Sequence, residues 1–298
     1  MKLCLGTVQF GMDYGILNQK KPLLSDAVKW LDYATQNGIS AIDTAKAYGN
    51  AEEVVGEFLK LHTIPREELF LSTKLLPNIL DDVSPSDYER VIEREIIEQL
   101  RTLNTDYVDA YVFHSARYAH DIRKLEAIRS VVDKGYAKKS GLSIYEPDEA
   151  VDCYESGLVD FIQAPYSIFD HRMKKSGVLD HSKRGACEIH TRSAFIQGLI
   201  IMNEENVPFF LDKAKPIVKK ITSICESEGI SRTHLALQYV KRESGISHLV
   251  FGVDSLEQLK EDISLFNKDL PNDLISKIGN EFDNIEADIV MPSLWKKE

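Results

Sequence analysis

Cysteine is scarce in this chain of 298 residues, and its four copies form no CxxC pair. They are Cys4, Cys153, Cys187 and Cys225. Without paired spacing, the sequence indicates neither a zinc site nor a disulfide framework. The histidines add no metal signal, because no His or Cys pair lies at ligand spacing and His190 stands alone. We therefore expect no metal and a reducing, cytoplasmic location.

Long apolar runs and basic clusters are also missing. The apolar run at the N-terminus is broken by Gly6, Gln9 and Gly11 before a signal peptide or a membrane span could form. The 47 acidic residues outnumber the 36 basic ones and give a net charge of -11. No basic patch offsets this charge, so we expect neither a membrane nor a nucleic acid as partner.

Short apolar runs rich in β-branched and aromatic residues alternate with longer segments of helical periodicity. This alternation predicts βαβ units around a parallel sheet. Eight strands are predicted, at Lys2 to Val8, Ser40 to Thr44, Leu69 to Lys74, Tyr107 to His114, Lys139 to Ile144, Phe161 to Pro165, Glu188 to Arg192 and His248 to Val253. Predicted helices include Ser25 to Asn37, Ala51 to Leu61, Pro85 to Leu103, Ile122 to Asp133, Pro147 to Glu155, Pro216 to Glu228 and Leu256 to Phe266.

Eight strand-helix repeats without a glycine-rich linker favour a single α/β domain, a (β/α)8 TIM barrel over residues 1–298. Ser25 is expected to cap the first long helix and Gly38 to end it in a left-handed conformation. The segment from Lys174 to Arg184 and the tail from Asn284 onward are predicted to be loops.

Polar residues close three of the apolar strands. Asp43, Lys74 and His114 each do so, and Tyr48 follows Asp43 by five residues. Barrel enzymes carry their reacting groups at the carboxyl ends of the strands, so we expect these four side chains to meet at one mouth.

This set suits the reduction of a carbonyl group, which needs a proton at oxygen when hydride reaches carbon. Tyr48 would be the proton donor. The Lys74 ammonium would lower the phenol pKa, and Asp43 would hold Lys74 in place. His114 would orient and polarise the carbonyl oxygen.

Other readings of these residues remain open. A strand-end Asp often caps a helix, and a lone Tyr or His is usually structural. Lys74 could instead be the Schiff-base amine of an aldolase or isomerase.

The sequence resembles the aldo-keto reductases over nearly its whole length. The resemblance lies in LGTVQFG, GISAIDTAKAYGNAEEVVGEFL, STK, VDAYVFHS, KSGLSIY and FIQAPYS, in that order. It implies a catalytic set of Asp43, Tyr48, Lys74 and His114, and NADP(H) bound without a Rossmann domain, with NAD(H) also possible. The implied coenzyme contacts are Gly6, Thr7, Asp43, Ser143, Gln163, Arg192, Ser193, Gly252, Ser255, Gln258 and Asp262. Among them, Ser143 and Gln163 match the positions that hold the nicotinamide carboxamide.

The chain departs from the family pattern in three places. Ile144 follows Ser143 where the family usually has Asn, so one amide contact is missing. Arg192 stands where many members stack a Tyr on the nicotinamide, and a guanidinium can also stack on a flat ring. The segment that matches the adenosine-phosphate site, from Ser255 to Asp262, offers Lys260 as its one cation, although a 2′-phosphate favours charged donors.

The substrate is expected to be an aldehyde, ketone or sugar carbonyl, bound by loops after the strands. The candidate substrate residues are Phe10, Tyr14, Tyr48, His114, Arg117, Tyr118 and Trp295. A different class of protein, a sensor that binds nicotinamide with little turnover, also uses this barrel. The sequence leaves the oligomeric state open.

Overall fold

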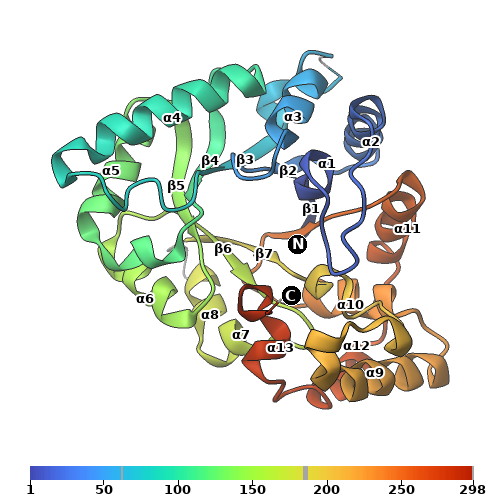
Figure 1. The fold of residues 1–298 in the computed structure, drawn as a ribbon. Coiled ribbons are helices and arrows are strands. Elements are labelled where there is room, and N and C mark those ends of the chain that lie inside the picture. Colours follow the sequence, from blue (N-terminus) through green and yellow to red (C-terminus); the bar gives the residue numbers. More distant parts are fainter. Residues whose placement is uncertain (62, 184–186, 297–298) are drawn as a thin grey trace.

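Eight parallel strands close into a barrel in sequence order, from β1 to β8, with β8 pairing back onto β1. Figure 1 shows the strands at the centre and the helices around them. The structure, a computed structural model, describes residues 1–61, 63–183 and 187–296. The strands are β1 (Lys2–Gly6), β2 (Ala41–Asp43), β3 (Phe70–Leu75), β4 (Val108–Phe113), β5 (Ala137–Ser143), β6 (Phe161–Pro165), β7 (Glu188–Arg192) and β8 (His248–Phe251). The predicted fold class is confirmed.

Helices follow the strands and cover the outside of the barrel. The α-helices are α1 (Val8–Gly11), α2 (Leu24–Gln36), α3 (Ala51–Leu59), α4 (Tyr88–Leu103), α5 (Ile122–Asp133), α6 (Pro147–Ser156), α7 (Arg172–Lys175), α8 (Val178–Lys183), α9 (Lys215–Ser227), α10 (Arg232–Lys241), α11 (Leu256–Phe266), α12 (Asn272–Asn280) and α13 (Ala287–Val290). Short 3-10 helices are η1 (Arg66–Glu68), η2 (Pro85–Asp87), η3 (Ala116–His120), η4 (Ile196–Gly198), η5 (Glu204–Asn206), η6 (Phe209–Ala214) and η7 (Pro292–Leu294).

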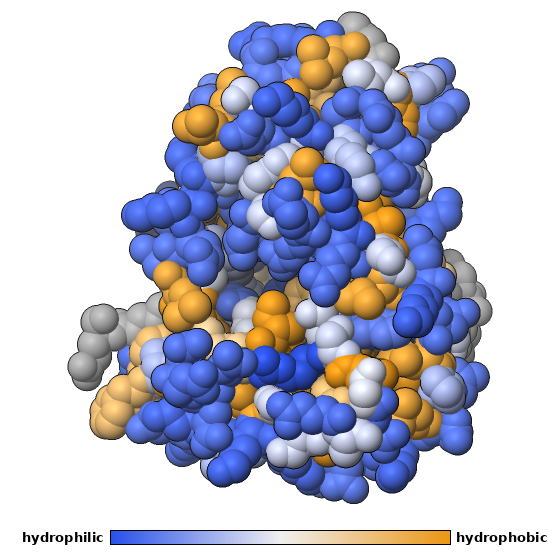
Figure 2. Space-filling view, turned by 90° about the vertical axis from the view of Figure 1, so that its right-hand side faces the viewer, coloured by the Kyte–Doolittle hydropathy of each residue, from blue (hydrophilic) through white to orange (hydrophobic). Residues whose placement is uncertain are grey.

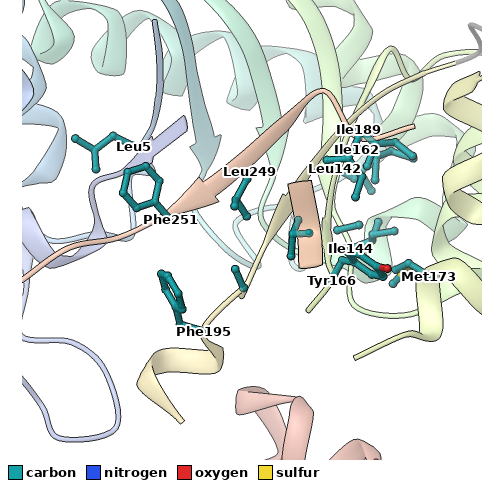
Figure 3. Close-up of a cluster of buried hydrophobic side chains, with 14 of the residues drawn as sticks. Leu5, Leu142, Ile144, Ile162, Tyr166, Met173, Ile189, Phe195, Leu249 and Phe251 are labelled. Atoms are coloured by element: carbon teal, nitrogen blue, oxygen red, sulfur yellow. The ribbon is translucent and has the colours of Figure 1, made fainter. Parts of the chain in front are cut away.

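The main core lies between the strands and the surrounding helices. Leu142, Ile162 and Ile189 sit in register on β5, β6 and β7, and Figure 3 shows their side chains together. All three are fully buried. Because successive strand residues point to opposite faces, the residues between them point into the barrel. This alternation is what brings ionisable side chains to the inside and to the mouth.

Three local predictions were wrong. Helix α2 begins at Leu24 with Leu23 as its N-cap, so Ser25 lies inside the first turn. Much of the loop predicted at Lys174 to Arg184 is helical in α7 and α8, because Met173 and Val178 are buried against the core; Arg184 itself lies outside the described residues. The tail contains α13 and η7. Gly38 does adopt the left-handed conformation expected at a helix end, with φ +88°.

Hydrophilic residues cover most of the face that Figure 2 presents, with apolar residues scattered among them. Among the described residues, no helix combines the length and the apolar character that crossing a bilayer requires.

Candidate active site

A buried ion pair lies at the carboxyl ends of β2 and β3. The Lys74 Nζ donates to both Asp43 oxygens, at 2.8 and 2.7 Å, and to the Thr44 carbonyl at 3.0 Å. Lys74 is fully buried and Asp43 nearly so. Two further donors hold Oδ1 of Asp43, namely the Ser72 hydroxyl at 2.9 Å and the Gln163 amide at 2.8 Å. These hydrogen bonds hold the carboxylate in place, facing the ammonium.

Tyr48 lies between Lys74 and His114. The Lys74 Nζ is 4.9 Å from the centre of the phenol ring, and the His114 ring meets it edge-on at 5.6 Å. The sequence brings them together because His114 directly follows β4 and Tyr48 lies in the turn between β2 and α3. The structure thus brings four side chains together at one mouth of the barrel, as the strand ends predicted. They are Asp43, Tyr48, Lys74 and His114.

Burial and charge set the protonation of these groups. Burial raises the pKa of Tyr48, and the nearby Lys74 ammonium only partly opposes this. Burial acts to lower the pKa of Lys74, but the Asp43 carboxylate and Tyr48 outweigh it and the pKa is raised. At neutral pH the phenol therefore keeps its proton beside a charged ammonium.

His114 is neutral at the same pH. Burial, followed by the charges of Lys74 and Arg192, lowers its pKa to about 3. Its Nδ1 is buried without a hydrogen-bond partner. A neutral imidazole has one N–H to donate, which is what a carbonyl oxygen can accept.

Two glycines bring the Tyr48 turn against α1. A Cβ on Gly11 would lie 1.7 Å from the Tyr48 carbonyl oxygen, and a Cβ on Gly49 would lie 2.3 Å from the Gly11 oxygen. Gly49 also has a φ of +58°, which favours glycine. The sequence analysis missed this role, although the glycines stand in the quoted motifs QFG and YG.

A polar network behind β3 was also missed. Glu52 Oε1 accepts hydrogen bonds from the Thr73 hydroxyl and the Gln99 amide, both at 2.6 Å. Gln99 also donates to the Lys74 carbonyl at 3.1 Å and accepts from the Tyr111 hydroxyl at 2.7 Å. Thr73 is the outward neighbour of Lys74, so the network anchors the strand that presents the ammonium.

A cavity of about 660 Å³ opens beside Tyr48 and His114. This volume is in the range of small-molecule and cofactor sites. Twelve of the predicted site residues line it: Gly6, Thr7, Tyr14, Asp43, Tyr48, His114, Ser143, Gln163, Arg192, Ser193, Gly252 and Gln258. Lining residues that the sequence analysis did not select include the amides Gln9, Gln19, Gln197, Asn203 and Asn206.

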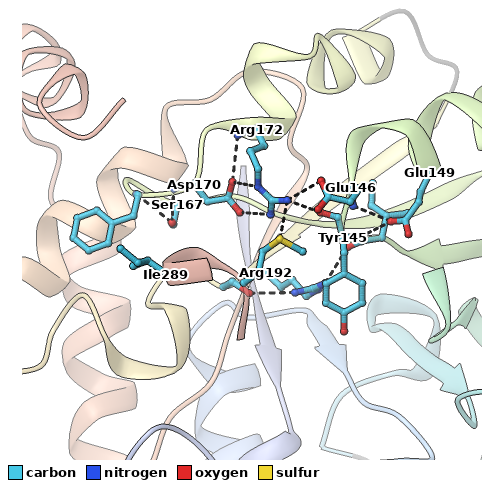
Figure 4. A network of polar contacts seen from close by, with 12 residues as sticks. Tyr145, Glu146, Glu149, Ser167, Asp170, Arg172, Arg192 and Ile289 are labelled. Atoms are coloured by element: carbon cyan, nitrogen blue, oxygen red, sulfur yellow. Dashed lines mark hydrogen bonds and ion pairs between the residues drawn. The ribbon is translucent and has the colours of Figure 1, made fainter. Parts of the chain in front are cut away.

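Arg192 presents a guanidinium to this cavity without a carboxylate partner among the described residues. It donates to the Ile144 carbonyl at 2.9 Å and to the Ser193 hydroxyl at 3.3 Å, and it lies 4.5 Å from the centre of the Tyr145 ring. Figure 4 shows Arg192 beside Tyr145, close to the network of Arg172 and Asp170. Its positive charge therefore remains available to the cavity.

Four predicted substrate residues lie away from the cavity lining. Phe10 is buried edge-on against Trp30. Tyr118 is buried and its hydroxyl donates a hydrogen bond to Asp81, and Arg117 forms an ion pair with the same carboxylate. Trp295 is largely buried and donates to the Ile289 carbonyl at 3.3 Å. Each side chain meets a partner inside the protein, which a single sequence does not reveal.

Two predicted coenzyme residues are also absent from the lining. The Ser255 hydroxyl caps α11 by accepting a hydrogen bond from the backbone N–H of Gln258 at 3.0 Å. Asp262 is fully buried, and burial raises its pKa to about 8. The cation of this segment, Lys260, lies over the Tyr33 ring at 5.5 Å. Of the residues predicted to bind the coenzyme between Ser255 and Asp262, Gln258 is the one that lines the cavity.

The closed barrel carries ionisable groups at the carboxyl ends of its strands, which is the arrangement found in α/β-barrel enzymes. Residues 2–280 match the model of the Aldo/keto reductase family, and the chain belongs to this family of oxidoreductases. It is 25% identical to the NADH-specific methylglyoxal reductase of Escherichia coli, over 78% of this chain and 80% of the relative. It is 24% identical to the D-arabinose 1-dehydrogenase of Saccharomyces cerevisiae, over 89% of this chain and 84% of the relative.

Solved structures show the same fold at lower identity. The aldo-keto reductase AKR11C1 of Bacillus halodurans, in its holo form, superposes with a TM-score of 0.76 at 20% identity, over 97% of this chain and 94% of that one. An aldo/keto reductase of Klebsiella pneumoniae in complex with NADP and acetate superposes with a TM-score of 0.69 at 19% identity, over 94% of this chain and 90% of that one.

Proposed function

We propose that this protein reduces an aldehyde, ketone or sugar carbonyl to an alcohol, with Tyr48 as the general acid. The observation that carries the proposal is the position of Tyr48, which is partly buried, packs against Lys74 and lies next to His114 at the wall of the cavity. In this reaction a hydride adds to the carbonyl carbon and a proton adds to its oxygen.

Each member of the set has a separate task in the proposal. Tyr48 gives its proton to the oxygen, and the Lys74 ammonium stabilises the phenolate that remains. Asp43 keeps Lys74 charged and in place through the two short hydrogen bonds. Neutral His114 donates an N–H to the same oxygen and so orients the substrate.

A nicotinamide coenzyme, when bound, supplies the hydride. The cavity fits such a group, since it extends from Tyr48 to Gly252, which follows β8, and to Gln258 in the first turn of α11, where backbone N–H groups favour phosphate. At the other end, Ser143 and Gln163 offer polar atoms for a carboxamide, and the Arg192 guanidinium offers a flat face for a ring.

NADP(H) is our first choice of coenzyme, in line with the NADP complex of the Klebsiella structure. The described lining contains no lysine, however, and Arg192 is its one arginine. A 2′-phosphate at the α11 end therefore lacks a charged donor, so we expect NADH to be used as well. The E. coli relative, named as NADH-specific, fits this expectation.

The amide side chains of the cavity support a polar carbonyl substrate, since amides pair readily with hydroxyl groups. The test follows NADPH and NADH oxidation over a panel of aldehydes, ketones and sugars. We expect turnover with both coenzymes, within about tenfold, and a preference for hydroxylated carbonyls. Tight coenzyme binding without turnover on any carbonyl would contradict the proposal and favour a nicotinamide sensor.

A further inference from the structure

A second polar cluster lies at the amino-terminal end of the barrel, opposite the active-site mouth. Glu188 is the first residue of β7, His190 is the third, and His248 is the first residue of β8. His190 and His248 are paired in register, which brings Glu188 to both imidazoles. The sequence did not predict this cluster because 57 residues separate the two histidines in the chain.

The three side chains face one another at short range. Oε1 of Glu188 is 2.9 Å from His190 Nε2 and 3.7 Å from His248 Nδ1. One ligand atom from each residue lies within 4.8 Å of the other two. Ligands bound about 2 Å from one zinc ion lie up to about 4 Å apart, so small side-chain rotations gather these three around an ion.

Aromatic rings hold the imidazoles in place. Phe70 contacts both, with ring centres 4.9 Å from His190 and 5.8 Å from His248. Phe161 meets His190 edge-on at 4.6 Å. Packing therefore limits both imidazoles to small movements before any ion arrives, which lowers the entropy lost on binding.

The hydrogen bonding of the cluster is incomplete without a further partner. His190 is fully buried, yet its Nδ1 has no hydrogen-bond partner. Lys139 pairs with Oε2 of Glu188, which leaves Oε1 directed at the imidazoles and the Ser247 hydroxyl.

We propose that Glu188, His190 and His248 bind a divalent transition-metal ion, with Zn²⁺ the best match to two imidazoles and a carboxylate. The ion joins the starts of β7 and β8, which pair at only two positions, His190 with His248 and Thr191 with Leu249. A water completes the tetrahedral set from the solvent side, where the His248 side chain is 13% exposed. This site is separate from the cavity and stabilises the closed barrel.

The test uses full-length protein treated with EDTA, freed of chelator and titrated with Co²⁺ and Zn²⁺. Wild type is expected to bind one Co²⁺ with the visible absorption bands of a tetrahedral site, and Zn²⁺ is expected to displace it and raise Tm. Glu188→Gln and His248→Asn are expected to bind at least about tenfold more weakly. Lys139→Met, which removes a competing ammonium, is expected to bind more tightly.

The matched control is His120→Asn, which removes an exposed imidazole paired with Asp152. It is expected to bind both ions like wild type, and circular dichroism verifies that each variant is folded. The proposal is overturned if wild type shows no saturable Co²⁺ spectrum, if Glu188→Gln and His248→Asn bind as wild type does, or if Lys139→Met binds no more tightly. Carbonyl reduction is not the readout, so failure here leaves the proposed function standing.

Discussion

Lys74 and Asp43 form a buried ion pair in which the ammonium lies 2.8 and 2.7 Å from the two carboxylate oxygens. Neither side chain has appreciable contact with solvent. Removing one partner of such a pair leaves a buried charge without compensation, which is far more destabilising than losing a surface pair. The pair thus links the stability of the barrel to the chemistry at its mouth.

Asp43→Asn should therefore destabilise the protein by about 3 to 5 kcal/mol. The matched control is Glu57→Gln, which breaks the exposed pair with Lys60 and should change stability by less than about 1 kcal/mol. Urea denaturation at pH 7 measures both. Equal losses in the two variants would mean that the Asp43 pair has no special structural role.

Lys74→Met should move the pH profile of reduction. Tyr48 acts in its protonated form, so the rate falls as the pH rises through the phenol pKa. Because the ammonium lowers that pKa, its removal should shift the alkaline limb of kcat/KM to higher pH. The double variant Asp43→Asn, Lys74→Met removes both charges of the pair, so neither is left without its partner, and it serves as a folded control. An alkaline limb at the wild-type pH in both variants would show that Lys74 does not tune Tyr48.

His114 should make the stability of the protein depend on pH. An unfolded histidine takes up a proton near pH 6.5, but the native His114 resists it down to about pH 3. The unfolded state therefore binds more protons in this window, and stability falls as the pH drops from about 6.5.

His114→Gln is expected to flatten the fall in stability between about pH 6.5 and pH 4 in urea denaturation. His120→Asn is the control, because Asp152 raises the pKa of His120, and its protonation therefore stabilises the native state as the pH falls toward the unfolded value of about 6.5, where the gain is complete. That variant should change the slope only above about pH 6.5 and leave the acid-side fall as in wild type. The account of His114 fails if His114→Gln leaves the acid-side fall as steep as in wild type.

Gly11→Ala should disturb the turn that carries Tyr48. A methyl group there overlaps the Tyr48 carbonyl oxygen, so the turn must move. We expect kcat to drop by about tenfold or more, since small displacements of a catalytic group are costly in rate. Gly135→Ala is the control, because Gly135 has a φ of +79° and open space around it. It should lower Tm but leave kcat and KM at wild-type values. Wild-type kcat in Gly11→Ala would show that the contact does not position Tyr48.

The sequence predicted the barrel well because its signals are local and repeated. The eight strands are short apolar runs, and α5 and α11 have the predicted bounds. Residues at strand ends were also predictable, because parallel strands deliver their carboxyl ends to one rim. Asp43, Lys74 and His114 follow from that rule alone.

What the sequence did not predict depends on partners far away in the chain. Arg117 and Tyr118 follow His114 closely, but Asp81 holds both away from the cavity lining. The Glu188, His190 and His248 cluster exists only through the pairing of β7 with β8. Helix α10 was overlooked because buried residues cover most of its surface, which weakens the helical period of its apolar positions.

The most direct test of the account is Tyr48→Phe, which removes one oxygen from the centre of the site. Stopped-flow measurements of coenzyme binding and of single-turnover hydride transfer separate the two roles of the cavity. The account predicts that coenzyme dissociation constants stay within about twofold of wild type while hydride transfer slows by roughly 100-fold or more. Hydride transfer at the wild-type rate in this variant would contradict the account.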